Sequence, residues 1–312
     1  MNKERDVWVR EVGVRDGLQS IATIFSTATK LEWIEREAAA GVSEIEVGSF
    51  VPAKLLPQMA DTAAVVAGAK NIPDLHISVL VPNLRGAESA LAAGANQLNY
   101  VLSVSEAHNR ANVRRSVQES VDDFARIIAL RDSRPEYRSI RVAGGLATAF
   151  GCTIAGQVAL SDVLAAARAL VELGADELAI ADTVGYGNPA QCRQIFREVL
   201  QIAGSIPVAA HFHDTRGLGL ANVDAALDVG VRRFDASLGG LGGCPYAPGA
   251  SGNIVMDDLV FMLEAMGLAT GVDLEALLET RKFMESHLDQ EPTRGAIARA
   301  GLPKDFVRSR SA

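Results

Sequence analysis

The feature that most constrains the fold of this chain is a regular alternation of short apolar runs with longer patterns of helical period. The runs are rich in Val and Ile, as in strands that are buried on both faces. They predict strands at Val7–Val14, Glu44–Val47, His76–Val81, Gln97–Leu102, Ser139–Ala143, Glu177–Ala181, Pro207–Phe212 and Arg233–Ser237. The patterns between them predict helices at Thr29–Ala40, Asp61–Ala67, Leu84–Ala93, Ser116–Leu130, Leu160–Leu173, Pro189–Ala203 and Leu220–Val229.

Glycine often separates a predicted helix from the next strand, as in AAGVSEIEV, AAGANQLNY, ELGADELAI and DVGVRRFDA. Only glycine enters the left-handed conformation that ends a helix without a steric penalty. Eight strand–helix units in succession predict an α/β fold of the (β/α)8 TIM-barrel type. A doubly wound sheet is the alternative, but no G-x-G-x-x-G motif opens the first helix and no break into two domains is visible.

Beyond about residue 254 the pattern is helical, in MDDLVFMLEAMG and VDLEALLETRKFMESHL, with no further strand signal. We therefore expect one domain over 1–312. Its barrel spans about 7–265, additional C-terminal packing helices span about 266–303, and a flexible tail spans 304–312.

The composition excludes several classes of protein. Hydrophobic residues make up 48% and charged residues 22% of the chain, which excludes a disordered protein. A formal charge of −8 argues against a nucleic-acid partner, and no apolar run reaches the roughly 18–20 residues of a membrane span. The N-terminus, MNKERDVWVREV, is charged where a signal peptide is apolar. Cys152, Cys192 and Cys244 are odd in number and widely spaced, so we expect free thiols and a cytoplasmic protein.

A candidate metal site lies at the end of the predicted seventh strand, in AAHFHDTRG. His211 and His213 share one face there because side chains alternate along a strand, and two such imidazoles can chelate a divalent ion. Two polar residues that merely end a strand are an equally open interpretation. Asp16, in EVGVRDGLQ at the end of the first strand, could reach the same ion because all strand ends converge on one barrel mouth. The alternative for Arg15 and Asp16 is an ion pair that closes a turn.

This ligand set suits Mg²⁺ or Mn²⁺, whereas structural zinc is disfavoured because the chain has no C-x-x-C pair. Glu46 and Asp182 end the second and sixth predicted strands. Each is a candidate for catalysis, for orienting a ligand, or for capping the following helix. For Asp182, capping and catalysis are about equally plausible.

The segment Ser237–Asn253, SLGGLGGCPYAPGASGN, is the most informative stretch of the sequence. Glycine at this density is typical of a mobile loop that approaches a ligand closely. Cys244 in this loop could act as a general acid or base, although a free Cys more often fills a core. Asn253 could supply a further oxygen ligand. A Schiff-base aldolase is excluded because every Lys lies in a predicted terminus, loop or helix, so carbon–carbon chemistry here would need a metal.

Four motifs, EVGVRDGLQ, IEVGSF followed by PQMAD, AHFHDTRGLGLAN and GGLGGCPYAPGASGN, together resemble the hydroxymethylglutaryl-CoA lyase family. This family belongs to a metal-dependent barrel superfamily that also holds isopropylmalate synthase. The similarity runs from about Val9 to about Leu278, in the family's order.

The resemblance implies a retro-Claisen cleavage of a 3-hydroxy-3-methylglutaryl-CoA-like thioester into acetyl-CoA and acetoacetate, or a related 3-keto acid. The ligands that it implies for the divalent ion are Asp16, His211, His213 and Asn253. Arg15 would stabilise the enolate oxygen. The family also suggests a homodimer or a higher homo-oligomer.

The resemblance assigns further roles in catalysis and substrate binding. Cys244 and His211 are the implied proton carriers. Glu46, Gln19 and Asp182 would orient the ligands and the acyl-CoA substrate. Asn112 fits the family pattern in SEAHNRANV as a substrate-binding residue.

Several positions depart from the family pattern. Ser20-Ile21-Ala22 stands where the family usually has Asn-Glu and often a nearby Lys, and residues 151–156 read GCTIAG where Gly-Cys-Pro-Tyr-Glu-Gly is usual. His108 replaces a common aromatic residue, and residues 289–291, DQE, stand where basic residues usually face the CoA phosphates. We therefore expect the reaction type to hold better than the acyl group, and a longer or branched 3-hydroxyacyl-CoA stays open.

Two other functions remain as alternatives. A condensing relative similar to isopropylmalate or homocitrate synthase shares the RD and H-x-H motifs, but such chains usually carry an extra C-terminal domain. A catalytically silent barrel that binds acyl-CoA or metal is disfavoured, because Arg15, Asp16, both histidines and Cys244 are all retained.

Overall fold

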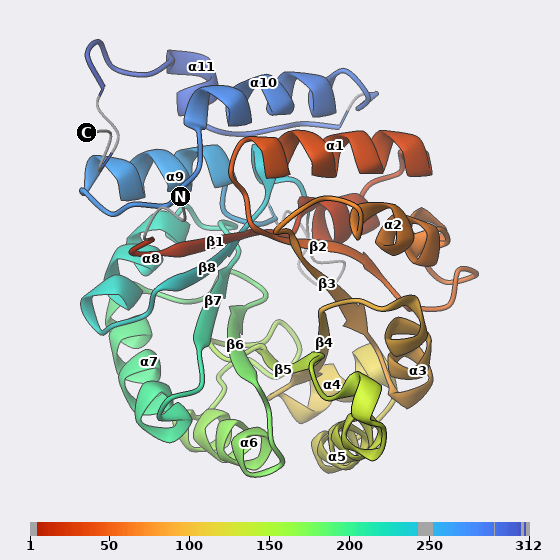
Figure 1. Ribbon diagram of the computed structural model, residues 1–312. Coiled ribbons are helices and arrows are strands. Elements are labelled where there is room, and N and C mark those ends of the chain that lie inside the picture. The colour runs from red at the N-terminus through yellow and green to blue at the C-terminus, as the bar shows by residue number, and fades with distance from the viewer. Residues whose placement is uncertain (1–4, 243–251, 290, 307–308, 310–312) are drawn as a thin grey trace.

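The computed structural model describes residues 5–242, 252–289, 291–306 and 309. Eight parallel strands form a closed barrel in sequence order, and β8 pairs with β1 to close it (Figure 1). Helices connect the strands on the outside of the barrel. The predicted TIM barrel is confirmed and the doubly wound alternative is wrong.

The observed elements match the predicted alternation closely. The strands are β1 (Trp8–Glu11), β2 (Glu44–Ser49), β3 (His76–Val81), β4 (Gln97–Ser103), β5 (Arg141–Ala147), β6 (Glu177–Asp182), β7 (Val208–Phe212) and β8 (Arg233–Ala236). The α-helices are α1 (Thr27–Ala39), α2 (Thr62–Ala69), α3 (Leu84–Ala93), α4 (Glu106–Val113), α5 (Val117–Ser133), α6 (Leu160–Glu172), α7 (Pro189–Ala203), α8 (Gly219–Asp228), α9 (Met256–Ala265), α10 (Leu274–Glu285) and α11 (Ile297–Ala300). Short helical turns are η1 (Gly13–Gly17), η2 (Pro57–Met59), η3 (Pro135–Tyr137) and η4 (Leu238–Gly240).

The first strand is shorter than predicted. β1 ends at Glu11, and the chain then turns through η1, a single π-helical turn in which Arg15, Asp16 and Gly17 all donate their backbone N–H to the carbonyl of Val12. Apolar burial continues through Val12 and Val14, which is why the sequence pattern extends beyond the strand. Arg15 and Asp16 therefore lie on a tight turn over the barrel and not on a strand end.

The connection between β4 and α5 holds a helix, α4, that the sequence analysis did not predict. The side chain of Ser105 caps its first turn by accepting from the backbone N–H of His108. The helix ends at Arg114, which adopts a left-handed conformation with φ of 59°. This two-turn helix carries His108 and Asn112 to the mouth of the barrel.

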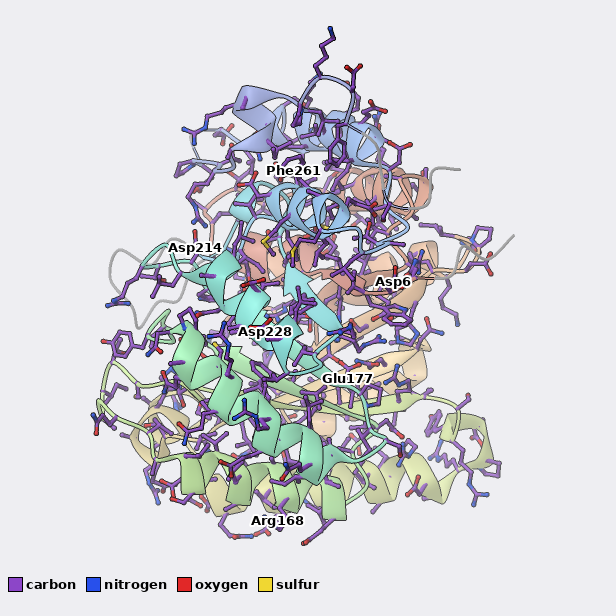
Figure 2. The ribbon with its side chains drawn as sticks, turned by 90° about the vertical axis from the view of Figure 1, so that its left-hand side faces the viewer. Asp6, Arg168, Glu177, Asp214, Asp228 and Phe261 are labelled. Carbon is purple, nitrogen blue, oxygen red and sulfur yellow. The ribbon has the colours of Figure 1, made fainter. Side chains whose placement is uncertain are left out.

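The barrel interior is polar at its amino-terminal end. Arg10 forms ion pairs there with Glu177 and, through Nε, with Asp235 at 3.2 Å. The apolar core lies instead between the strands and the helices, where the largest buried side chains include Trp33, Phe124 and Phe196. In Figure 2 Asp214, which follows β7, lies on the left, and Glu177, the first residue of β6, lies to its right, so the carboxyl ends of the strands face left.

The C-terminal helices pack beside the N-terminal helix of the barrel, with α10 alongside α1 (Figure 1). The segment after α10 also reaches the barrel mouth. The backbone N–H of Arg294 donates to the Gly239 carbonyl, and its guanidinium donates to the carbonyls of Gly240 at 2.6 Å and Asn253 at 3.2 Å. The predicted C-terminal helices are confirmed. Much of the predicted tail, 304–312, lies outside the described residues, and the assignment of one domain stays a prediction.

Within the described part of the chain, no helix is both long enough and apolar enough to cross a membrane.

The glycines that end α1 and α6 give a matched test of what glycine contributes. Gly41 and Gly174 both have φ of +96°, but a Cβ at Gly41 would overlap the Gly271 carbonyl, whereas one at Gly174 would meet only Ile128, at 3.7 Å. We expect Gly174→Ala to cost about 1 kcal/mol of unfolding free energy from backbone strain alone. Gly41→Ala should cost about 2–4 kcal/mol because steric overlap adds to the strain. Urea unfolding of both variants measures this, and equal losses would contradict the steric argument.

Candidate active site

A cavity of about 950 Å³ lies at the carboxyl ends of the strands. It is lined by the predicted site residues Arg15, Asp16, Gln19, Glu46, Asn112, His211 and His213. Its wall beside β2 and β3 is apolar and includes Val51, Leu55, Leu56, Leu80 and Val81. The fold thus gathers most of the predicted site into one space, with charged groups at one side and apolar groups at another.

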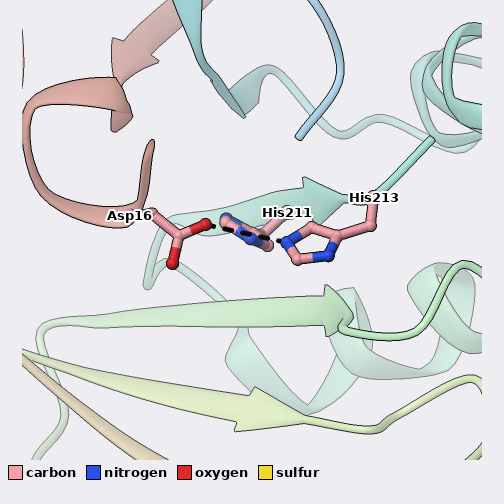
Figure 3. A group of neighbouring side chains, drawn as sticks. All are labelled: Asp16, His211 and His213. Carbon is pink, nitrogen blue, oxygen red and sulfur yellow. Dashed lines mark ion pairs between the residues drawn. The ribbon is translucent and has the colours of Figure 1, made fainter. Parts of the chain in front are cut away.

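Asp16, His211 and His213 form a compact cluster in this cavity (Figure 3). One potential ligand atom from each residue lies within 4.8 Å of the others. His213 Nε2 lies 3.7 Å from Asp16 Oδ2, and the two imidazole rings are 5.1 Å apart. The cluster is a possible metal site, because two imidazole nitrogens and a carboxylate oxygen converge on a small volume.

The Asp16 carboxylate is held from both sides. Its Oδ1 accepts from Arg15 Nη1 at 2.6 Å and from Gln19 Nε2 at 2.8 Å, while Oδ2 accepts from Asn253 Nδ2 at 2.7 Å. Burial alone would raise the pKa of Asp16, but the charge of Arg15 and the contacts with both histidines outweigh it and hold the pKa well below its usual range. Asp16 is therefore an ionised carboxylate at any physiological pH.

His211 is oriented by Asp235, a residue that the sequence analysis missed. His211 Nδ1 lies 3.2 Å from Asp235 Oδ2, which leaves Nε2 as the nitrogen free to bind a ligand. Burial lowers the pKa of His211, but Asp235 and Asp16 outweigh this and raise it. A carboxylate that fixes an imidazole in this way is typical of metal-binding histidines. The only sequence signal was an acidic residue within the apolar strand RRFDA.

Two further buried atoms fit a cation at the cluster. His213 Nδ1 and Asn253 Oδ1 are both buried, and neither has a hydrogen-bond partner among the described residues. Buried polar atoms without a partner cost free energy, so such atoms beside an ionised carboxylate fit a site that binds a cation. A divalent ion that accepts oxygen and nitrogen ligands fits this donor set.

Arg15 is fixed between two carboxylates. Its Nε pairs with Glu46, and its Nη1 pairs with Asp16. Glu46 in turn accepts from Asn99 Nδ2 at 2.8 Å. Burial alone would lower the pKa of Arg15, but these carboxylates outweigh burial and raise it, so the guanidinium stays charged beside the cluster.

Asp182 is placed differently from the other predicted residues. It is fully buried outside the cavity lining, and it accepts from the backbone N–H groups of Tyr186 at 2.8 Å and Gly187 at 2.9 Å. These bonds shape the turn between β6 and α7, but they do not cap the helix, because the N-cap of α7 is Asn188, whose side chain accepts from the backbone N–H of Gln191. Burial raises the pKa of Asp182. Cys244 lies outside the described residues.

Comparisons with known proteins extend this description. The HMGL-like family model matches residues 7–284. The chain is 40% identical to hydroxymethylglutaryl-CoA lyase YngG of Bacillus subtilis, over 91% of this chain and 94% of the relative. It is also 40% identical to the cytoplasmic 3-hydroxy-3-methylglutaryl-CoA lyase of Rattus norvegicus, over 89% and 80% of the two chains.

A solved structure is equally similar. The HMG-CoA lyase of Acinetobacter baumannii, in complex with coenzyme A and 3-methylmalate, superposes with a TM-score of 0.91 at 40% identity, covering 98% of this chain and 99% of that one. Family model, relatives and structure agree over nearly the whole chain. The protein therefore belongs to the HMGL-like family.

Proposed function

We propose that this protein is a divalent-metal-dependent carbon–carbon lyase that cleaves 3-hydroxy-3-methylglutaryl-CoA, or a closely similar thioester, into acetyl-CoA and acetoacetate. The observation that carries the proposal is the Asp16, His211 and His213 cluster beside Arg15, inside the cavity of a chain of this family. Relatives at 40% identity are named for this reaction, and one of them binds coenzyme A.

The metal in this proposal is Mg²⁺ or Mn²⁺, held by Asp16, His211, His213 and the Oδ1 atom of Asn253. Asn253 Oδ1 has no hydrogen-bond partner among the residues that the structure describes, and Nδ2 of the same amide is already engaged with Asp16, which supports Oδ1 as the fourth ligand. When bound, such an ion polarises the hydroxyl group of the substrate and orients its oxygens.

Arg15 stabilises the negative charge that develops on the thioester oxygen as the acetyl-CoA enolate leaves. Glu46, with Asn99 behind it, holds the guanidinium in place, so Arg15 need not reorganise during the reaction. Gln19 keeps Asp16 oriented, and Asn112 at the cavity rim contacts the substrate. Asp182 supports the neighbouring turn.

Cys244 is the proton carrier that this proposal keeps. Asp235 engages Nδ1 of His211, so if Nε2 held the metal, that ring would have no nitrogen left for proton transfer. We therefore assign His211 to metal binding. Cys244, as the thiolate, takes up the proton that the substrate hydroxyl group loses when the carbon–carbon bond breaks, and then donates it to the enolate carbon to give acetyl-CoA.

The apolar cavity wall supports one alternative substrate. Val51, Leu56 and Val81 could contact a longer or branched acyl group of a different 3-hydroxyacyl-CoA. A cytoplasmic location, which the free buried thiols of Cys152 and Cys192 support, and a homodimer remain parts of the proposal.

The reaction and the metal are tested together by adding hydroxymethylglutaryl-CoA to metal-stripped protein. We expect acetyl-CoA release on addition of Mg²⁺ or Mn²⁺ and loss of at least 95% of it with excess EDTA, since the metal activates the hydroxyl group. Acetyl-CoA release that EDTA does not change would contradict a metal-dependent mechanism. If protein that binds Mn²⁺ releases no acetyl-CoA, the substrate is a different 3-hydroxyacyl-CoA.

Cys244→Ala tests the proton carrier. The loss of a positioned general acid should lower kcat about 10²–10⁴-fold, with little effect on Mn²⁺ affinity. Cys192→Ala is the matched control, because that thiol is buried in α7 outside the cavity lining. Equal activity of the two variants would remove Cys244 from the mechanism.

Asp235→Asn tests the orientation of His211. An amide cannot accept the Nδ1 proton as strongly, so Mn²⁺ affinity measured by calorimetry should fall about 10–100-fold. Glu44→Gln is the control, because Glu44 pairs with Arg233 and Arg10 in the same barrel interior without touching His211. An equal loss in both variants would show a general effect of barrel charge instead.

A further inference from the structure

Two buried carboxyl groups lie directly behind the turn that carries Arg15 and Asp16. Glu11 is the last residue of β1, Glu37 lies on α1, and both are fully buried. Their side chains hydrogen-bond to each other. Such a bond requires a proton on one of them, because an ionised carboxylate can only accept.

Glu11 connects this pair to both chain segments that build the site. It accepts from the backbone N–H of Gly13 and, at 3.0 Å, from that of Leu238. Gly13 opens η1, which contains Arg15 and Asp16, while Leu238 opens the segment 238–242 that runs up to the cavity mouth. A Cβ at Gly13 would overlap the Glu11 carboxyl group, so the contact is close.

Glu37 is fixed in turn by Trp33, one turn earlier on α1, whose Nε1–H donates to Glu37 Oε1 at 2.7 Å. The other oxygen, Oε2, is buried and has no conventional donor among the described residues. The proton shared with Glu11 gives Glu37 Oε2 its hydrogen bond.

Within the described ranges of the chain, no cation pairs with either carboxyl group. Among the described residues, neither Glu11 nor Glu37 takes part in a salt bridge. The charged groups on the elements packed around it are engaged elsewhere: Arg15 with Asp16 and Glu46, Lys30 with Asp61, Arg281 with Asp257 and Glu285, Arg10 with Glu177 and Asp235, Glu264 with Thr270, and Asp258 with the backbone of Ala296.

Burial is the main cause of the altered acidity of both groups. It raises the pKa of Glu37 to about 8, and it raises the pKa of Glu11 well above its ordinary value, with the neighbouring carboxyl adding to the effect. At neutral pH the pair therefore retains a proton.

We propose that Glu11 and Glu37 share a proton and act as a positioning pair that holds the turn bearing Arg15 and Asp16 against the segment 238–242. Loss of the Glu37 proton in mildly alkaline solution puts a negative charge without a cationic partner among the described residues into this buried site, so the pair rearranges and both segments loosen. Neither residue touches the substrate. The inference relies on the proposed lyase function for its activity readout alone.

The first test measures the proton without any substrate. The chain has two tryptophans, Trp8 and Trp33, so Trp8→Phe leaves Trp33 as a fluorescent reporter bonded directly to Glu37. We expect its emission to titrate with a midpoint near pH 8, and Glu37→Gln in the same background to abolish the transition. An unchanged midpoint in Glu37→Gln, or no transition in the parent, would overturn the shared proton.

The second test measures positioning through Mn²⁺ affinity and kcat between pH 6.5 and 9. The parent should lose at least tenfold in both above pH 8, whereas Glu37→Gln, which keeps a donor for Glu11 and an acceptor for Trp33, should stay flat. Glu37→Leu preserves volume but not the bond, and it should be weakened at every pH. An alkaline loss that persists in Glu37→Gln would assign the effect to other groups. Mn²⁺ affinity tests the positioning role of the pair even if the protein cleaves no thioester.

Stability gives a third readout with a definite sign. Because the folded pKa of Glu37 is raised, the folded state binds one proton more than the unfolded chain between the ordinary glutamate pKa and about 8. The folding equilibrium constant of the parent should therefore fall up to about tenfold per pH unit across this window, relative to Glu37→Gln. Parallel stability curves for the two proteins would contradict the proposal.

Discussion

The ionised carboxylate of Asp16, buried at the barrel mouth, is the group on which the arrangement of the site depends. A buried charge is costly unless it is paired and hydrogen-bonded. Arg15, Gln19 and Asn253 all meet this requirement by turning toward Asp16. The same contacts leave Asn253 Oδ1 without a hydrogen-bond partner in the described part of the chain. Compensation of one charge thus preorganises the groups that would bind a cation.

A series of ion pairs also runs through the barrel interior and ends at His211, beside Asp16. Glu177 pairs with Arg10, Arg10 with Asp235, and Asp235 with His211. Buried ion pairs contribute little net stability, because desolvation offsets most of their attraction. Their effect here is directional, since each member fixes the orientation of the next. The orientation of the His211 imidazole therefore depends, through Arg10 and Asp235, on Glu177 at the opposite end of the barrel.

Much of this architecture could be predicted from the sequence, because the spacing of apolar residues distinguishes the buried strands from the amphipathic helices. The errors have local causes. The apolar pattern extends the predicted first strand to Val14 because apolar burial continues through η1. Asp235 was missed because a single acid in an apolar strand has no motif. The pairing of Glu11 with Glu37 depends on how α1 docks on β1, which no local pattern encodes.

The site lies at the seam where the barrel closes, and this couples folding to chemistry. β1 and β8 pair in parallel, which brings residues from the start of the chain beside those near its end. Glu11 then bonds to Leu238, Asp16 bonds to Asn253, and Arg294 bonds to the backbone of both Gly240 and Asn253. These contacts exist only in the closed barrel. A ligand that binds the Asp16 cluster must therefore stabilise closure as well, because it binds the folded chain and not the open one.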